Sequence, residues 1–196
     1  MATASIVRVE AVESGGEGPV GYVDTLPLVN QMTSEGVTTP HGTLHHLPYF
    51  RMQGGENAII CDPKVGDIGL AVFASRDISV VKTTKTQSQP GSFRRFDMAD
   101  GCYFGGFLNG TPTQWVEFTE DGLNVTDKNG NSIVMGPDGI LITDKTGNTI
   151  NMSAMGIHTH DAVADTTIGS NTHSHMQPND SHGDTEAPTL KPTDGT

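Results

Sequence analysis

Asp121-Gly-Leu-Asn-Val-Thr-Asp-Lys-Asn-Gly-Asn-Ser-Ile-Val-Met135 is followed, seventeen residues on, by Asp138-Gly-Ile-Leu-Ile-Thr-Asp-Lys-Thr-Gly-Asn-Thr-Ile-Asn-Met152. The two stretches are identical at nine of fifteen positions, and a third copy begins in Met155-Gly-Ile-His-Thr-His-Asp161. Self-similarity at a fixed period is typical of solenoids and other stacked repeats. This repeat therefore decides the fold of the C-terminal part of the chain.

Each repeat has the pattern of two short strands joined by turns. In the first copy Leu123 and Val125 alternate with polar residues, which is the period of a strand. Asp127-Lys-Asn-Gly130 then predicts a turn, because glycine adopts positive φ at little cost. The same pattern recurs in the second copy, so each repeat is expected to run strand, turn, strand, turn.

A few such repeats make a poor fold for a single chain. Short repeats without aromatic caps stack weakly, and their outer strands would keep unpaired edges. Three copies wound about one axis would bury the Ile, Leu, Val and Met side chains together and pair those edges. We therefore expect residues 119–160 to form the shaft of an intertwined, triple-stranded β-helix in a homotrimer.

The remainder of the chain has a different composition. Every Phe, Tyr, Trp and Arg lies at or before Phe118. Residues 1–118 read as short strands separated by Gly, Pro, Asn and Asp, with one weakly helical piece at 76–82, which favours a small β-barrel such as an OB-fold. The expected fold is thus all-β, with an OB-fold-like domain at 1–118, the shaft at 119–160 and a tapered tip at 161–196.

Composition and charge exclude several kinds of protein. The 196 residues carry a formal net charge of −12, which disfavours a nucleic-acid groove. The start of the chain lacks the pattern of a secretory signal peptide, and no apolar stretch is long enough to span a bilayer, so synthesis in a cytoplasm is expected. Cys61 and Cys102 are too few for a disulfide scaffold, and we expect two buried, reduced thiols.

Two His-x-His pairs are the candidate metal ligands. Residues two apart on a strand share a face, and a threefold axis turns one pair into six nitrogens, an octahedral cage for Fe²⁺ or another first-row divalent ion. His173 and His175 are the first choice because they lie past the last full repeat. His158 and His160 are the second choice, since Ile157 and Thr159 would point inward if that strand keeps its register. A cage closed by six protein ligands would make the iron structural.

No enzymatic motif was found. The chain lacks a phosphate-binding loop, a dinucleotide glycine fingerprint, a nucleophile elbow and a His-Glu-x-x-His pair, so we expect no catalysis and no small-molecule substrate. Two alternatives stay open. One is a metallohydrolase that combines the His pairs with Asp161 or Asp180, and the other is an OB-fold binding module on a trimeric stalk.

The chain resembles the central membrane-piercing spikes of contractile phage tails, also called baseplate assembly protein V. The resemblance is carried by Cys61-Asp-Pro-Lys-Val-Gly-Asp-Ile-Gly-Leu-Ala-Val-Phe73, similar to the OB-fold domain of that family, and by Asn171-Thr-His-Ser-His-Met-Gln-Pro178, similar to its iron-binding apex. It implies a trimeric collar attached to the baseplate hub and tail tube, a β-helical shaft and a sharp tip. It also implies a virion protein at the tail tip, synthesised and assembled in the cytoplasm of the host bacterium. Such a protein makes transient mechanical contact with the host outer membrane when the sheath contracts.

Overall fold

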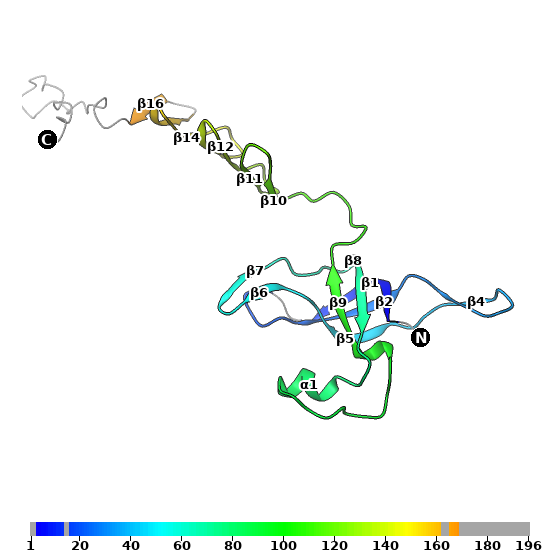
Figure 1. Cartoon of the computed structure of the whole chain (residues 1–196). Helices are drawn as coiled ribbons and strands as arrows, with labels where there is room; N and C mark the ends of the chain where they lie inside the picture. The colour runs from blue at the N-terminus through cyan, green and yellow to red at the C-terminus, as the bar shows by residue number, and fades with distance from the viewer. Residues whose placement is uncertain (1–2, 14–15, 162–164, 169–196) are drawn as a thin grey trace, which may run out of the picture. The chain divides into compact units, whose positions relative to one another are not determined.

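The computed structural model describes residues 3–13, 16–161 and 165–168, the last four by their backbone alone. The chain divides into two compact units, Met1–Gly110 and Thr111–Thr196. Nearly all of the regular structure is β, which confirms the all-β fold expected from the sequence (Figure 1). Among the described residues, no helix is long and apolar enough to cross a membrane.

The first unit is built on one five-stranded antiparallel sheet with the order β5-β2-β1-β8-β9. The strands are β1 (Ala4–Glu13), β2 (Tyr22–Pro27), β5 (Leu44–Pro48), β8 (Ile68–Phe73) and β9 (Gly101–Gly105). The two outer strands meet just beyond β5, where Tyr49 and Tyr103 form a parallel bridge and the Phe50 N–H donates to the Tyr103 carbonyl at 2.8 Å. The sheet therefore curls into a half-barrel.

The core of this unit fills the inside of the curl. Alternate residues of the strands point inward, as the two-residue period requires. The buried apolar side chains are those of Val7, Val9, Val23, Leu47, Tyr49, Ala71, Phe73 and Tyr103. Gly101 has to be a glycine here, since an added β-carbon would stand 2.9 Å from the ring of Phe73 and 3.1 Å from Leu47.

Two hairpins and a helical segment leave the half-barrel. The hairpins are β3 (Gln31–Met32) with β4 (Thr38–Thr39) and β6 (Met52–Gly54) with β7 (Asn57–Ile59), and the helical elements are α1 (Ser79–Thr84) and the 3-10 turn η1 (Met98–Asp100). Helix α1 lies close to the helical stretch expected from the sequence. It ends at Lys85, which has the left-handed φ of 56°.

The segment around α1 is fastened by buried carboxylates. Asp77 accepts from the Ser79 N–H at 2.8 Å and from the Ser92 hydroxyl at 2.6 Å, and these bonds hold its pKa well below the ordinary value. Arg94 pairs with both Asp77 and Asp100 at 3.1 Å. These hydrogen-bonded charges therefore tie the two ends of the long connection between β8 and β9 to each other.

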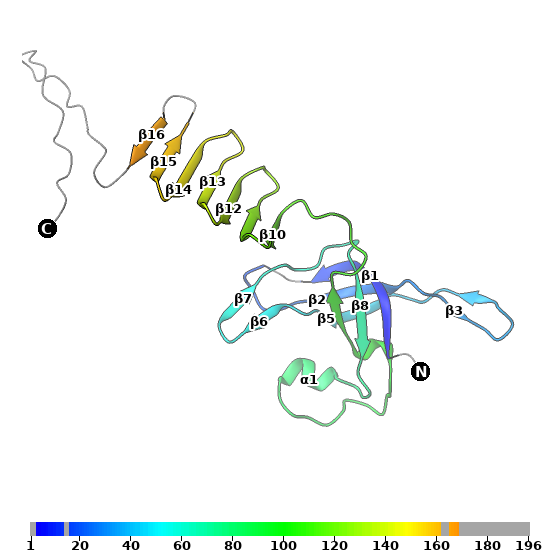
Figure 2. The same ribbon diagram turned by 45° about the horizontal axis from the view of Figure 1, so that its top comes forward.

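The second unit is a seven-stranded antiparallel meander whose strands lie in sequence order (Figure 2). They are β10 (Trp115–Phe118), β11 (Leu123–Thr126), β12 (Ser132–Gly136), β13 (Gly139–Thr143), β14 (Thr149–Ser153), β15 (Gly156–His160) and β16 (Asp165–Ile168). Each repeat supplies two strands, as its sequence pattern predicts. Trp115–Phe118 was placed in the N-terminal domain on its aromatic content, but the structure pairs it with β11 in the second sheet.

Strand pairing in the second unit leaves few strand edges free. The sequence predicts unpaired edges at the outer strands, and β10 and β16 do lie at the two ends of the sheet. In the structure β11 to β15 pair with their sequence neighbours on both sides. The feature left uncovered is therefore a face of the sheet.

Candidate functional site

The register of the second sheet sorts its side chains onto two faces. Residues paired directly across antiparallel strands share a face, and successive residues of a strand alternate between faces. The pairing from β10 to β15 has no register shift. Each row of partners across the sheet therefore belongs to one face.

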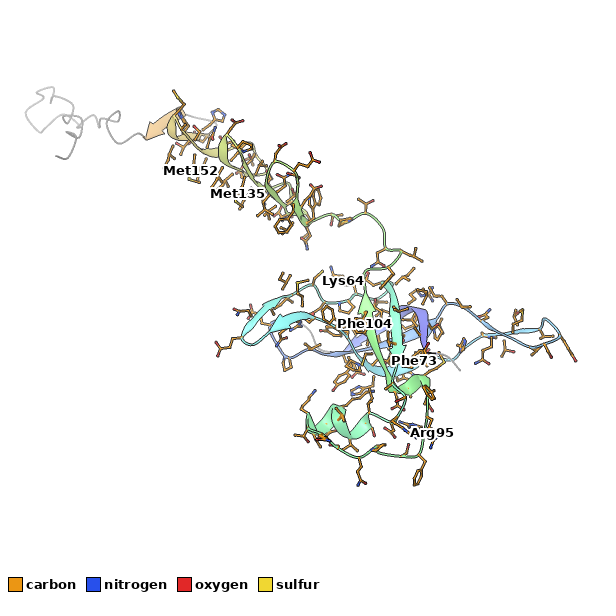
Figure 3. All side chains as sticks on the ribbon, in the orientation of Figure 1. Lys64, Phe73, Arg95, Phe104, Met135 and Met152 are labelled. Atoms are coloured by element: carbon orange, nitrogen blue, oxygen red, sulfur yellow. The ribbon has the colours of Figure 1, made fainter. Side chains whose placement is uncertain are left out.

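One of these faces is almost entirely apolar. Its two rows are Val116, Val125, Ile133, Ile142, Ile150 and Thr159, and Phe118, Leu123, Met135, Ile140, Met152 and Ile157. Eleven of these twelve residues are apolar, and we call this surface the apolar face. Figure 3 labels Met135 and Met152, which occupy the same place in successive repeats and flank Ile140 in one row.

The apolar face is not covered within the described chain. None of the described residues of β10 to β15 is buried, and the Phe118 side chain is 85% exposed. By contrast, every buried apolar side chain of the described residues lies in the first unit. A contiguous apolar surface of this kind is rare on a monomer and marks an interaction surface.

The opposite face is polar but carries little charge. Its two rows are Trp115, Thr126, Ser132, Thr143, Thr149 and His160, and Glu117, Asn124, Val134, Leu141, Asn151 and His158. Threonine, serine and asparagine dominate, and Glu117 is the one carboxylate in these rows. This composition suits a face turned to solvent, and we call it the polar face.

The long turns of successive repeats are closed by aspartates. Asp127 accepts from the backbone N–H groups of Asn129 at 2.8 Å and Asn131 at 2.9 Å and from the amide groups of both side chains. Hydrogen bonds from Asn131 lead the interactions that hold the pKa of Asp127 below its ordinary value. Asp144 is held in the same way in the next repeat, where the Thr146 hydroxyl and Asn148 lower its pKa to about 2.

The short turns on the other side of the sheet depend on glycine. Gly122, Gly139 and Gly156 recur at the repeat period with φ of 156°, 130° and 110°. A β-carbon on Gly139 would collide with the carbonyl oxygen of Met152, and one on Gly122 with that of Met135. These glycines let adjacent strands approach, which explains why the repeat conserves them between copies.

The second-choice metal ligands lie on the polar face. His158 pairs with Asn151 and His160 with Thr149, whereas Ile157 pairs with Met152 on the apolar face. As expected from the sequence, the two histidines and Ile157 therefore lie on opposite faces of the sheet. If the apolar face turns to an axis, this pair points away from it.

The first-choice ligands, His173 and His175, lie outside the described residues, as does Asp180 of the hydrolase alternative. Asp161 is exposed at the end of β15. Over the described ranges, no group of three or more His, Cys, Asp or Glu side chains is placed to hold a metal ion.

The histidines of the first unit are paired with carboxylates. His45 Nδ1 lies 2.7 Å from Asp24 Oδ2, and His46 Nδ1 lies 3.2 Å from Glu13 Oε2. His46 also stacks on Tyr22 with the ring centres 3.7 Å apart. These contacts tie β5 to β1 and β2.

Both cysteines are free thiols. Cys102 is half-buried, whereas Cys61 is exposed. The expectation of burial is therefore wrong for Cys61, because this residue follows the exposed β6–β7 hairpin.

No protein-family model matches the chain, and no curated protein matches it significantly.

Sequence reasoning found the repeat but missed the full extent of the apolar face. Val116 and Phe118 extend it by one strand. Their alternation continues that of Leu123 and Val125, so the periodicity carried the signal. The prediction followed the aromatic composition of this stretch instead of its periodicity, and it therefore placed the strand in the first unit, whereas the structure pairs it with β11.

Proposed function

We propose that the chain is the subunit of a homotrimeric tail-tip spike of a contractile phage, which pierces the host outer membrane mechanically. The observation that carries this proposal is the apolar face of β10 to β15. It presents eleven apolar side chains, and no part of the described chain covers them. Burial of such side chains is worth roughly 1.5–3 kcal/mol each, so other copies of the chain have a strong drive to cover it.

The geometry supports an assembly in which each chain forms one wall. Because the strands pair within the chain, no strand exchange is needed to satisfy the backbone. Three walls with their apolar faces toward a common axis give a shaft with an apolar interior and the polar face outside. The resemblance to phage spikes favours three copies over a two-walled sandwich.

The strand order of the first unit supports an OB-fold collar. Naming the five strands 1 to 5 along the chain, the sheet runs 3-2-1-4-5, and the parallel bridge at Tyr49 and Tyr103 joins strands 3 and 5. OB-folds are five-stranded, partly open Greek-key barrels. We propose that this unit forms the collar that attaches to the baseplate hub and tail tube.

A piercing device needs stiffness, and the second unit has features that supply it. Its strands are joined along the shaft direction by backbone hydrogen bonds, and its long turns are closed by Asp127 and Asp144. The polar face exposes few charges that would resist passage through a lipid headgroup layer. Sheath contraction would provide the force, so the spike itself needs no active site, substrate or nucleic acid.

At the tip we propose a structural iron bound by His173 and His175 from three chains. Placement of His158 and His160 on the polar face supports ranking that pair second, because ligands for an ion on the axis must point inward. Six imidazole nitrogens would close the coordination sphere and stiffen a narrow end.

Electron cryomicroscopy of the purified full-length protein tests the proposal. We expect end-on averages with threefold symmetry and a shaft repeat of about 9.6 Å, two strand spacings per seventeen-residue repeat. Twofold averages, or single chains, would contradict it. Labelling of intact virions should then place the chain at the distal end of the tail.

A further inference from the structure

A pocket of about 310 Å³ is lined entirely by residues of the first unit. Its lining comes from the β6–β7 hairpin, the end of β9 and the segment before β8. We call it the Tyr103 pocket and define it by the residues used below, Phe50, Met52, Asp67, Tyr103 and Asn109. Its volume is at the lower end of the range for small-molecule sites.

Tyr103 lines the pocket, and its buried hydroxyl has no hydrogen-bond partner among the described residues. The Tyr103 side chain is 1% exposed, and its oxygen forms no hydrogen bond with any described residue. A β-carbon on Gly105, another wall residue, would stand 3.5 Å from that oxygen. Burial, with the charge of Asp67, raises the pKa of Tyr103 to about 12, so the hydroxyl stays protonated and can donate. Such groups are costly and rare, and one in a pocket wall points to a ligand.

The mouth of the pocket is aromatic and apolar. Phe50 is 58% exposed and stacks on Phe104, labelled in Figure 3, with ring centres 5.6 Å apart and planes inclined by 22°. Met52 extends this exposed surface. A stacked, solvent-facing ring presents a flat platform with a negative face, which attracts the polarised C–H groups of a ring lying on it.

The polar groups of the pocket do not suit an anion. Arg51 forms an ion pair with Asp62, with 2.7 Å between Arg51 Nη2 and Asp62 Oδ2, so these two charges neutralise each other. Asp67 remains, with one oxygen accepting from the Lys64 N–H at 2.8 Å. The pocket therefore has a negative balance and would repel phosphate, in keeping with the chain's net charge of −12.

We propose that the Tyr103 pocket binds a neutral sugar ring. The apolar face of the ring would lie on Phe50, and its hydroxyls would bond to Tyr103, to the carboxylate of Asp67 and to the amide group of Asn109. Asn109 Oδ1 already accepts from the Ile68 N–H at 2.8 Å, which fixes the amide in place. OB-fold barrels are known to bind oligosaccharides, on the face of strands 2 and 3, and the Tyr103 pocket would be a site at a different place on the barrel.

Titration calorimetry of the full-length protein tests the site with glucose, galactose, N-acetylglucosamine and its short β-linked oligomers at millimolar concentration. We expect at least one of these to bind. Tyr103→Phe should weaken binding about tenfold, the effect of one good hydrogen bond, and Phe50→Ala should abolish it. Phe93→Ala removes a fully exposed aromatic ring elsewhere on the unit and is the matched control, expected to bind normally. Absence of binding by the whole panel would overturn the proposal.

A second measurement does not depend on the sugar chosen. Because Tyr103→Phe removes a buried hydroxyl without a partner, it should leave the unfolding temperature unchanged or raise it. A clear fall would mean that the hydroxyl is satisfied within the protein, and the proposal would fail. Binding of an oligothymidylate at this site, or loss of the oligomer in Phe50→Ala, would also overturn it, in favour of a nucleic acid or of a neighbouring copy.

Discussion

Asn131 of one repeat accepts a hydrogen bond from the backbone N–H of Lys145 in the next, at 3.0 Å. The same side chain donates to Asp127 Oδ2 at 2.6 Å. One residue thus closes its own turn and fastens it to the turn above. The seventeen-residue period sets this spacing, because it returns the chain to the same place two strands later.

Replacing Asn131 by Ala should destabilise the second unit. The change removes the bond to Asp127 and the bond to Lys145, and a typical hydrogen bond contributes about 1 kcal/mol, so we expect a loss of about 1–2 kcal/mol per chain. Denaturant unfolding followed by circular dichroism measures it. Lys128→Ala alters an exposed residue of the same turn and should change stability little; an equal loss in both variants would refute the role of the inter-turn bond.

Substitutions at Gly139 and Gly147 distinguish the cost of a positive φ from the cost of a steric collision, because only Gly139 has a close backbone neighbour. Gly147→Ala meets no neighbour within 4 Å and suffers the positive φ alone, roughly 1–2 kcal/mol. Gly139→Ala adds a collision with the Met152 carbonyl, so a loss of about 3 kcal/mol or more is expected. Thermal unfolding should rank Gly139→Ala well below Gly147→Ala, and the reverse order would show that the short turn differs from the one described.

The second unit should lose stability in acid. The pKa of Asp144 is lowered from 3.8 to about 2, chiefly by the Thr146 hydroxyl. A depressed folded pKa contributes stability that is complete above the unfolded pKa and is lost as pH falls through the folded one. The unfolding temperature should therefore drop between about pH 4 and pH 2. Asp144→Asn should show a shallower drop, and a profile as steep as that of the unaltered protein would contradict this assignment.

Iron content discriminates between the two histidine pairs. His173→Ala combined with His175→Ala should remove the metal while the trimer persists, because the apolar face and not the ion holds the chains together. His158→Ala with His160→Ala is the matched control and should retain iron. Plasma emission analysis with a parallel mass measurement gives both readouts. Loss of iron in the control alone would reassign the site.

The shape of the second unit was largely predictable because its signals are local. Leu123 and Val125 alternate with polar residues, and Asp127 and Gly130 bound a turn, so strand and turn could be predicted within a few residues. The face on which His158 lies followed from the same period. These features depend on neighbours in sequence, which a repeat makes visible twice.

Contacts between distant residues could not be predicted in this way. The bridge of Tyr49 with Tyr103 joins segments more than fifty residues apart, and no local pattern announces it. The pairing of Arg51 with Asp62 and the orphaned hydroxyl of Tyr103 depend on how the barrel curls. Trp115 was misplaced because composition describes a segment and not its partners.

The claim that other copies cover the apolar face is central, and paired substitutions probe it. Ile142 lies on the apolar face, and its neighbour Thr143 lies on the polar face. Ile142→Lys should break the assembly, since a buried charge without a partner is prohibitive. Thr143→Lys places the same charge in solvent and should leave the assembly intact.

The most direct measurement is the mass of the full-length protein by light scattering during gel filtration. Three chains of 20.7 kDa predict a particle of about 62 kDa. A particle of 20.7 kDa, stable and soluble at micromolar concentration, would contradict the account, because the apolar face would then stand uncovered in water.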